Sequence, residues 1–319
     1  QASSFSGAEN MLVNFFSSPE ISKEYEISFS YCHSAEYENG LNRRLQKYTP
    51  RYPFRFPEPS NIIPFPQHLS QTFKRIICFI SRLISTLPIV AYELFLLHRL
   101  LINIRPDILH INNAGYPAAL SSRVATVSAR LAGVPYVIMV VNNLAVGYDR
   151  PSRWLNYPFD RFVVNSVSKF VTGSSVAAEQ LKKVLQLDNS KCMVIHNGIK
   201  LRDTTETIAE TKIRLGLSEF DGINFGVVSI LRPNKGHKIL LEAMAQILRL
   251  DTEISTMMKI LIEGDGPLRD ELERIVTTKQ LSDHCVFVGC EKNIMNFMSF
   301  IDVLILPSVS YEDFPNVIL

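Results

Sequence analysis

The sequence predicts an α/β protein built of two Rossmann-like domains, each a doubly wound parallel sheet. Three observations support this. Short runs rich in Val, Ile and Leu alternate with longer helical patterns, as is typical of parallel strands buried on both faces. The alternation occurs twice, before and after a polar segment at residues 200–210. The 319 residues suffice for two cores, so we expect one domain at residues 1–200 and a second at residues 201–319.

Each element follows from its local pattern of apolar residues. In the first half, this pattern predicts strands at residues 25–31, 107–111, 136–141, 170–172 and 193–196. It predicts helices there at residues 7–17, 117–131 and 176–185. In the second half, the predicted strands are residues 224–230, 259–263, 286–289 and 303–306. The predicted helices there are residues 238–250, 268–278 and 294–300.

Two segments of the first half need separate treatment. Residues 50–66 carry five prolines after the first position, which forbids a central strand and predicts a loop. Residues 76–101 are strongly apolar, but charged side chains such as Arg82 and Glu93 interrupt them, so we do not expect a membrane-spanning helix. Two amphipathic helices broken near Pro88 fit better, either as core helices or resting on a membrane face.

Charge is unevenly distributed along the chain. The net charge of +2 gives no case for nucleic-acid binding, yet residues 41–105 hold ten basic residues against two acidic ones. Aromatic residues lie among these bases, as at Tyr52 and Phe54. Basic and aromatic side chains together suit an anionic lipid surface or a pyrophosphate-bearing lipid acceptor, so peripheral membrane contact is expected there.

The cysteines and the two ends of the chain add further expectations. The five cysteines are scattered with no Cys-x-x-Cys pair, which indicates free thiols in a reducing compartment, the cytoplasm. No metal-ligand pattern and no Asp-x-Asp occurs, so no metal is expected. The first residue is Gln and the first element a helix, so we expect the opening strand of the fold to be missing.

The second domain offers a candidate diphosphate site after its first strand, because ligands bind at the carboxyl ends of parallel strands. In Leu231-Arg-Pro-Asn-Lys-Gly-His237, the cations Arg232 and Lys235 stand at the start of a helix. A solvated loop carrying two bases is the alternative. After the next strand, Gly264 and Gly266 are compatible with a dinucleotide turn, but a tight turn explains them equally well. Residues 290–292, after the third strand, could bring a backbone edge to a base.

The C-terminal residues Glu312-Asp-Phe-Pro-Asn-Val-Ile-Leu319 follow another buried strand. A carboxylate at the end of a strand, followed by a Pro that opens a helix, places charge and free backbone N–H groups at one point. That combination suits a polyol beside a diphosphate. A glutamate on a surface loop before an ordinary helix is the alternative.

The first domain presents small and polar residues where its strands end and its first helix starts. A small residue such as Gly7 lets a backbone N–H approach a phosphate, and His110 could touch a polar substrate, although a core histidine is equally compatible. The candidates for this cleft are Ser6, Gly7, His110, Asn112, Asn142 and Asn143.

These motifs together resemble the retaining GT-B glycosyltransferases of family 4. The resemblance extends nearly end to end and rests on the order and spacing of Ser6-Gly-Ala-Glu9, Asp107-Ile-Leu-His110, Val194-Ile-His-Asn-Gly-Ile199, Leu231-Arg-Pro-Asn-Lys-Gly-His237, Glu263-Gly-Asp-Gly-Pro-Leu268, Val286-Phe-Val-Gly289 and Glu312-Asp-Phe-Pro-Asn-Val-Ile-Leu319. It implies a GT-B fold whose N-terminal domain binds the acceptor and whose C-terminal domain binds the donor.

The resemblance also implies a reaction: a sugar moves from a nucleotide-diphosphate sugar to an acceptor hydroxyl with retention, without metal or other cofactor. Lys235 matches the lysine on the diphosphate, and Glu312 the first acid of the Glu-x7-Glu motif near the transferred sugar. The segment whose amides face the sugar and β-phosphate corresponds to Phe314, Pro315, Asn316 and Val317. The implied role is surface polysaccharide or glycolipid synthesis at the cytoplasmic membrane face, with a lipid-linked or saccharide acceptor.

Four positions depart from the family pattern. The second Glu of the motif would follow Leu319, so we expect the C-terminal domain to be incomplete. Ile230 replaces the usual arginine, Asn142 the usual histidine, and Asp313 the usual glycine. The changes at Ile230 and Asn142 motivate one alternative, a non-catalytic sugar-nucleotide or glycan-binding GT-B module. A further alternative is a different GT-B enzyme, a nucleotide-sugar epimerase or a glycogen-synthase-like polymerase.

Overall fold

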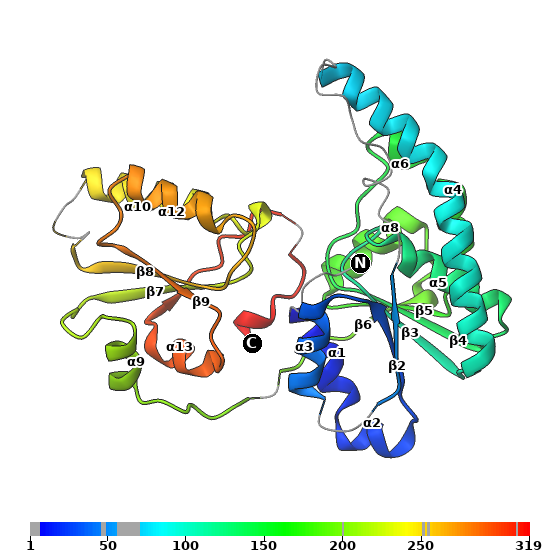
Figure 1. Ribbon diagram of the computed structural model, residues 1–319, viewed down its shortest axis with the longest axis horizontal. Coiled ribbons are helices and arrows are strands. Elements are labelled where there is room, and N and C mark those ends of the chain that lie inside the picture. Colours follow the sequence, from blue (N-terminus) through cyan, green and yellow to red (C-terminus); the bar gives the residue numbers. More distant parts are fainter. Residues whose placement is uncertain are drawn as a thin grey trace. The chain divides into compact units, whose positions relative to one another are not determined.

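The computed structural model describes residues 7–45, 49–55, 71–199, 201–250, 253, 256–310 and 312–319. The chain divides into two compact units (Figure 1). The first unit comprises Gln1–Ile199 with Asp313–Val317 and Leu319, and the second comprises Lys200–Glu312 with Ile318. Each unit is built of parallel strands and helices, which confirms the predicted α/β class.

The first unit contains a four-stranded parallel sheet in the order β3-β4-β5-β6 and a two-stranded parallel sheet, β1-β2. The strands are β1 (Phe29–Cys32), β2 (Arg51–Phe54), β3 (Ile108–Asn113), β4 (Tyr136–Val141), β5 (Lys169–Thr172) and β6 (Cys192–Val194). The helices are α1 (Gly7–Phe16), α2 (Pro19–Glu24), α3 (Ala35–Arg44), α4 (Gln71–Ile104), α5 (Leu120–Leu131), α6 (Pro151–Trp154), α7 (Tyr157–Ser166) and α8 (Ser175–Leu185).

The second unit has one four-stranded parallel sheet in the order β10-β7-β8-β9. Its strands are β7 (Ile223–Val228), β8 (Met258–Glu263), β9 (Cys285–Gly289) and β10 (Val303–Leu304). Its helices are α9 (Ile208–Arg214), α10 (His237–Leu250), α12 (Arg269–Thr278) and α13 (Ile294–Phe300). Figure 1 shows α10 and α12 on one face of this sheet and α9 and α13 on the other. Two clusters of buried side chains, one around Leu241 and one around Phe297, form the two cores.

The buried strands agree well with the sequence expectations. The strand predicted at residues 136–141 is β4, with the same bounds, and its alternate residues Val137, Met139 and Val141 lie in the core. The helix predicted from residue 117 begins only at Leu120, because Ala118 has a φ of 34° and Ala119 is extended. In the second unit, α9 begins at Ile208, inside the segment predicted as a linker, where Thr207 and Glu210 form a capping box.

Two predictions for the N-terminal part were wrong. Residues 25–28 are not strand, because β1 pairs with β2 over four residues only, from Phe29 to Cys32. Residues 51–54, predicted as loop, form that partner strand. Pro53 is compatible with β2 because the strand pairs with β1 alone among the described residues, and proline is tolerated at a sheet edge. Residues 56–70 of the proline-rich piece lie outside the described residues.

The expected break near Pro88 is also absent, since α4 is one helix from Gln71 to Ile104 with Pro88 inside it (Figure 1). Packing explains the continuity. Buried residues recur every fourth position at Ile89, Glu93, Leu97 and Leu101, and this stripe packs toward α5. Burial of the stripe offsets the backbone hydrogen bond that proline removes.

Among the described residues, one helical stretch, Thr86–Ile104, is long and apolar enough to cross a membrane by length and composition alone. Its mean hydropathy is 1.5, and 22% of it is buried inside the protein. One side of this stretch therefore serves the protein core, through Leu97 and Leu101. The other side exposes large apolar side chains, among them Leu87 and Phe95.

Glu93 makes the stability of this helix sensitive to pH. Its side chain is fully buried, neither carboxylate oxygen has a hydrogen-bond partner among the described residues, and burial raises its pKa to about 7. The folded state therefore binds this proton more tightly than the unfolded chain does. The associated stability is fully present below about pH 4.5 and is lost as the pH rises through about 7.

We therefore expect Glu93→Gln to stabilise the protein at pH 8, by on the order of 3 kcal/mol, because it removes a buried ionised group. At pH 5 the gain should largely disappear. Thermal unfolding of both proteins at the two pH values measures the difference. An equal shift in Tm at pH 5 and pH 8 would contradict a titrating Glu93.

Candidate active site

The loop after β7 forms the centre of the candidate site. It contains a short 3₁₀ turn, Pro233–Lys235, and ends at Gly236, after which α10 begins. Gly236 has a φ of 73°, and a Cβ there would overlap the carbonyl oxygen of Pro307. Only glycine fits this position, so the turn carrying Lys235 packs tightly on the segment after β10. A hydrogen bond of 2.9 Å from the Val309 amide to the Asn234 carbonyl joins the same two segments.

Lys235 and Glu312 form an ion pair, although 77 positions separate them in the sequence. They meet because β7 and β10 are neighbours in a parallel sheet, so the loops at their carboxyl ends lie together. The Ser308 hydroxyl donates to the same oxygen of Glu312, Oε1, at 2.9 Å. The lysine and glutamate side chains are 21% and 22% exposed, so both remain accessible to a ligand.

This pair places a cation and a carboxylate at one sheet edge within the second unit. The ammonium can bind a phosphate oxygen, and the carboxylate can accept hydrogen bonds from sugar hydroxyls. Arg232, directly before the 3₁₀ turn, is exposed and could add a second cation. That Lys235 and Glu312 meet is observed, while their catalytic and donor-binding roles stay predictions.

His237, the first residue of α10, supports this loop from within and was not among the sequence candidates. It is 1% exposed, and its Nε2 lies 3.0 Å from the Ser229 hydroxyl. Burial, and to a lesser extent the charge of Lys235, lowers its pKa to about 4. His237 is therefore neutral at physiological pH and adds no charge beside Lys235.

The glycines after β8 serve backbone packing. Gly264 has a φ of 120°, and a Cβ there would overlap the Ser229 carbonyl oxygen. At Gly266 a Cβ would come within 2.8 Å of Leu231 backbone atoms. The Leu231 amide also donates to the Asp265 carbonyl at 3.0 Å. A tight, closely packed turn thus explains both glycines, and their predicted part in donor binding stays a prediction.

The predicted donor residues Phe314 to Val317 belong to the first unit, whereas Lys235 and Glu312 belong to the second. Phe314 stacks on His196 with ring centroids 5.0 Å apart, and its carbonyl accepts from Asn197 Nδ2 at 2.9 Å. Asn197 Nδ2 also donates to Asn316 Oδ1 at 2.9 Å. Pro315 precedes the final 3₁₀ turn, Asn316–Ile318, which contains Val317 and takes the place of the helix expected there.

Asp313, which replaces the family glycine, lies at the start of α8. Its carboxylate accepts from the Gly173 amide at 3.0 Å and from the Ser174 hydroxyl. Ser174 is the N-cap of α8 and accepts from the Ala177 amide at 3.1 Å. An acidic group is favourable beside the N-terminus of a helix. No pattern in the sequence indicated this contact, because it joins residues 139 positions apart.

Two of the first-unit candidates, Asn142 and His110, lie in different surroundings, one polar and one apolar. Asn142, at the end of β4, donates from Nδ2 to Asn112 Oδ1 at 2.7 Å and to the Asn113 carbonyl at 3.0 Å. His110 instead packs against Phe15 and Phe16 of α1, which favours the core interpretation, and burial lowers its pKa.

The remaining first-unit candidates lie near the start of α1 and after β4. The Gly7 carbonyl accepts from Asn316 Nδ2 at 3.3 Å. Asn143 follows Asn142, and its Cβ would lie 3.5 Å from a Cβ added at Gly115. Ser6 lies outside the described residues.

A buried polar network holds the loops that follow β3 and β4. The Asp160 carboxylate of α7 is fully buried and accepts from Tyr116 Oη at 2.8 Å and from Tyr148 Oη at 2.7 Å. Two buried arginines also donate to it, Arg123 of α5 at 3.2 Å and Arg153 of α6 at 2.5 Å. Tyr116 follows β3 and Tyr148 follows β4, so Asp160 fixes both loops at one sheet edge. Sequence reasoning missed this network.

Within the described part of the chain, no group of three or more His, Cys, Asp or Glu side chains could hold a metal ion. The described residues of the candidate site are an ion pair, hydroxyl and amide side chains, and backbone groups. A ligand that complements this site carries an anionic group at Lys235 and hydroxyl donors at Glu312.

Comparison with protein families gives two matches along the chain. Residues 61–198 match the Glycosyl transferase 4-like domain, and residues 222–319 match Glycosyl transferases group 1. Together these models span most of the chain.

Curated relatives agree with the families. The chain is 28% identical over 233 residues to UDP-Gal:alpha-D-GlcNAc-diphosphoundecaprenol alpha-1,3-galactosyltransferase of Escherichia coli, a match covering 71% of this chain and 58% of that protein. It is 28% identical over 197 residues to 2-deoxystreptamine glucosyltransferase of Streptomyces kanamyceticus, covering 58% and 50%. The chain thus spans about half the length of the curated relatives it matches.

Among solved structures, Anabaena Alr3699/HepE in complex with UDP-glucose matches with a TM-score of 0.66 at 18% identity. That match covers 100% of this chain and 75% of the other. At this identity the likeness concerns the fold, two parallel-sheet domains of GT-B type. From both family matches and this fold, we conclude that the chain belongs to the group 1 glycosyltransferases of family 4, with the GT-B fold.

Proposed function

We propose that the protein transfers a sugar from a nucleotide-diphosphate sugar to an acceptor hydroxyl, with retention and without a metal. The observation that carries this proposal is the Lys235–Glu312 pair at the carboxyl ends of β7 and β10. Ligands of parallel α/β sheets bind at that edge. Membership of the glycosyltransferase family supplies the reaction class.

The chemistry of the step explains why a lysine is needed. The bond from the anomeric carbon to the diphosphate breaks, and negative charge accumulates on the departing phosphate oxygen. Lys235 supplies a fixed positive charge beside this oxygen. Such a charge stabilises the developing negative charge far more in a preorganised site than it would in water. The carboxylate of Glu312, held by the Ser308 hydroxyl, is placed to accept hydrogen bonds from the sugar.

The donor can be identified by thermal shift with a panel of UDP-, GDP- and ADP-sugars, each with EDTA present. We expect one nucleotide class to raise Tm, because a ligand that binds only the folded state stabilises it. Release of the nucleoside diphosphate on adding an acceptor then tests transfer. A stabilising donor that is turned over to an epimer without any acceptor would support an epimerase instead.

For the acceptor, we propose a sugar carried on a lipid diphosphate. The Escherichia coli relative is named for an acceptor on diphosphoundecaprenol. The local surplus of basic residues between positions 41 and 105 is compatible with such an anionic lipid. The corresponding donor is a UDP-sugar, the class named for that same relative. Transfer to an undecaprenyl-diphosphate sugar, compared with the free sugar, tests the assignment.

We further propose that α4 rests on the cytoplasmic face of a membrane. Its exposed side carries Leu87, Tyr92, Phe95 and Ile102, which are 76%, 48%, 60% and 45% exposed. Arg99, also exposed, lies within the same stripe. Apolar side chains beside a cation suit the interface of an anionic bilayer, where the apolar face is buried and the cation meets lipid phosphates.

The double variant Leu87→Ser/Phe95→Ser should reduce binding to phosphatidylcholine–phosphatidylglycerol vesicles by roughly tenfold or more, because two apolar side chains no longer enter the interface. Co-sedimentation measures the bound fraction. The control is Ile239→Ser/Leu250→Ser, which removes two exposed apolar side chains from α10 in the other unit. Equal loss in both double variants, or no loss in either, would contradict docking through α4.

A further inference from the structure

The loop after β9, residues 290–293, lies at the same sheet edge as the Lys235–Glu312 pair. In the strand order β10-β7-β8-β9, it is two strands away from the loop that carries Lys235. Neighbouring strands are about 4.8 Å apart, so the two loops are separated by roughly 10 Å along this edge. A nucleotide whose diphosphate lies at Lys235 can therefore extend along the edge and bring its base to residues 290–293.

Glu263 holds this loop from the strand side. It is the last residue of β8, is 9% exposed, and accepts through Oε1 from the backbone amide of Glu291 at 3.0 Å. The β8–β9 register shifts at Ile262/Glu263, and Gly289 ends β9 with a φ of 80°. Such irregularities re-aim side chains and loops at the ends of strands. Here they lie where the loop 290–293 leaves β9, next to the Glu291 amide that donates to Glu263.

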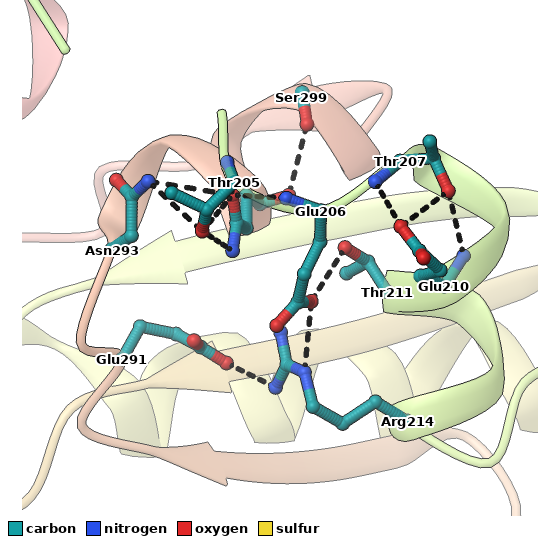
Figure 2. A network of polar contacts seen from close by, with 10 residues as sticks. Thr205, Glu206, Thr207, Glu210, Thr211, Arg214, Glu291, Asn293 and Ser299 are labelled. Atoms are coloured by element: carbon teal, nitrogen blue, oxygen red, sulfur yellow. Dashed lines mark hydrogen bonds and ion pairs between the residues drawn. The ribbon is translucent and has the colours of Figure 1, made fainter. Parts of the chain in front are cut away.

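Arg214 of α9 also holds this loop, through the Glu291 carboxylate (Figure 2). Its Nη1 donates to Glu291 Oε1 at 2.7 Å, and its Nε donates to Glu206 Oε2 at 3.0 Å. The Glu291 side chain is only 9% exposed. Glu291 is therefore held at two points, because its backbone amide donates to Glu263 and its carboxylate accepts from Arg214.

The network continues into the segment by which the chain enters the second unit, as Figure 2 also shows. Asn296, 3% exposed on α13, accepts from the Thr205 amide at 2.8 Å and from the Glu206 amide at 3.3 Å. Asn293, the N-cap of α13, donates to the Asp203 carbonyl at 2.9 Å. These bonds join residues 203–206, α9 and the loop 290–293 into one hydrogen-bonded body.

We propose that Glu263 and Arg214 are positioning residues for nucleotide recognition: they hold the backbone of residues 290–293 where it can bind the base of the donor. The inference rests on the proposed function and deepens it by naming two side chains that hold the loop expected from the sequence to meet the base. Neither side chain needs to touch the base. Glu263 acts through the Glu291 amide, and Arg214 acts through the Glu291 carboxylate.

Burial of the Glu263 carboxylate costs folding free energy, which argues for a role of this residue beyond stability. Burial raises the pKa of Glu263 to about 7, and the nearby Glu291 carboxylate adds to this rise, while the hydrogen bond from the Glu291 amide opposes it. An apolar residue at this strand end would avoid that penalty. Titratable groups kept in such surroundings are concentrated at functional sites.

The test separates the base end of the nucleotide from its diphosphate end. Calorimetry measures the affinity for the tightest binder among UDP, GDP and ADP, and separately for inorganic pyrophosphate. Glu263→Leu should weaken the nucleotide about tenfold and leave pyrophosphate unchanged, because only the loop at the base end is released. Glu263→Gln keeps an oxygen that accepts from the Glu291 amide and should restore nucleotide affinity to within about twofold.

Arg214→Met provides a second variant if Glu263→Leu fails to fold, since the Arg214 side chain is 38% exposed. It should raise the KM for the sugar nucleotide with little change in kcat. The control is Lys279→Met, which removes the ion pair of Lys279 with Glu242 within the same unit, where the lysine side chain is 28% exposed. A folded Glu263→Leu or Arg214→Met protein with unchanged nucleotide affinity, or one that loses pyrophosphate binding equally, would overturn the inference. Wild-type protein that binds neither the nucleotides nor pyrophosphate would overturn the proposed function itself.

Discussion

Lys235→Ala should lower sugar transfer by about 10²–10³-fold, because it removes the positive charge that faces the departing diphosphate. The fold should survive, since Lys235 lies on a 3₁₀ turn with its side chain 21% exposed and outside both cores of the second unit. Steady-state turnover of the donor identified by thermal shift measures the effect. Thermal unfolding of the same preparation establishes that the loss is not caused by unfolding.

Lys238→Ala is the matched control for this prediction. Lys238 lies three residues further on, in the first turn of α10, and pairs with Glu271 on α12. Its side chain is 47% exposed, and exposed pairs of this kind contribute little to stability. Turnover that falls equally in both variants would point to a general electrostatic effect. Unchanged turnover in Lys235→Ala would reject Lys235 as the diphosphate ligand.

Asp160→Asn should destabilise the protein by about 3–5 kcal/mol, because it leaves the buried arginines without their counter-ion. Arg123 and Arg153 are 6% and 7% exposed, and the asparagine cannot neutralise either charge. The Nε atoms of both arginines already lack partners among the described residues, so other acceptors are scarce. Urea unfolding monitored by circular dichroism measures the change in free energy.

Tyr148→Phe is the comparison for Asp160→Asn. It removes one hydrogen bond of 2.7 Å to Asp160 but leaves the charges paired. The expected cost is about 1 kcal/mol, the ordinary contribution of a hydrogen bond. A similar cost for the two variants would contradict charge burial as the main contribution of Asp160.

The elements whose sequence pattern and packing agree were predictable. Strand β4 has apolar residues on both faces, as a central strand of a parallel sheet requires, and its bounds follow from that pattern. Where propensity and packing compete, prediction failed. Pro88 argues locally for a break, but the buried stripe through Ile89 and Leu97 keeps α4 continuous.

The site was predictable to the extent that sheet topology determines it. Parallel neighbours bring their carboxyl ends together, so candidates after two strands can meet, as Lys235 and Glu312 do. The Asp160 network could not be predicted, because its partners Tyr116 and Arg123 lie 44 and 37 positions away on other elements. The same holds for Asp313 at the start of α8, whose partner Ser174 is 139 positions away.

Calorimetric titration of the stabilising sugar nucleotide into wild-type and Lys235→Ala protein, with EDTA present, tests the central claim most directly. We predict binding to the wild type without a divalent cation and an affinity at least about tenfold lower in the variant, the cost of losing one charge-assisted bond to the diphosphate. Equal affinity of the two proteins, or wild-type binding that requires added metal, would contradict a metal-free diphosphate site at Lys235.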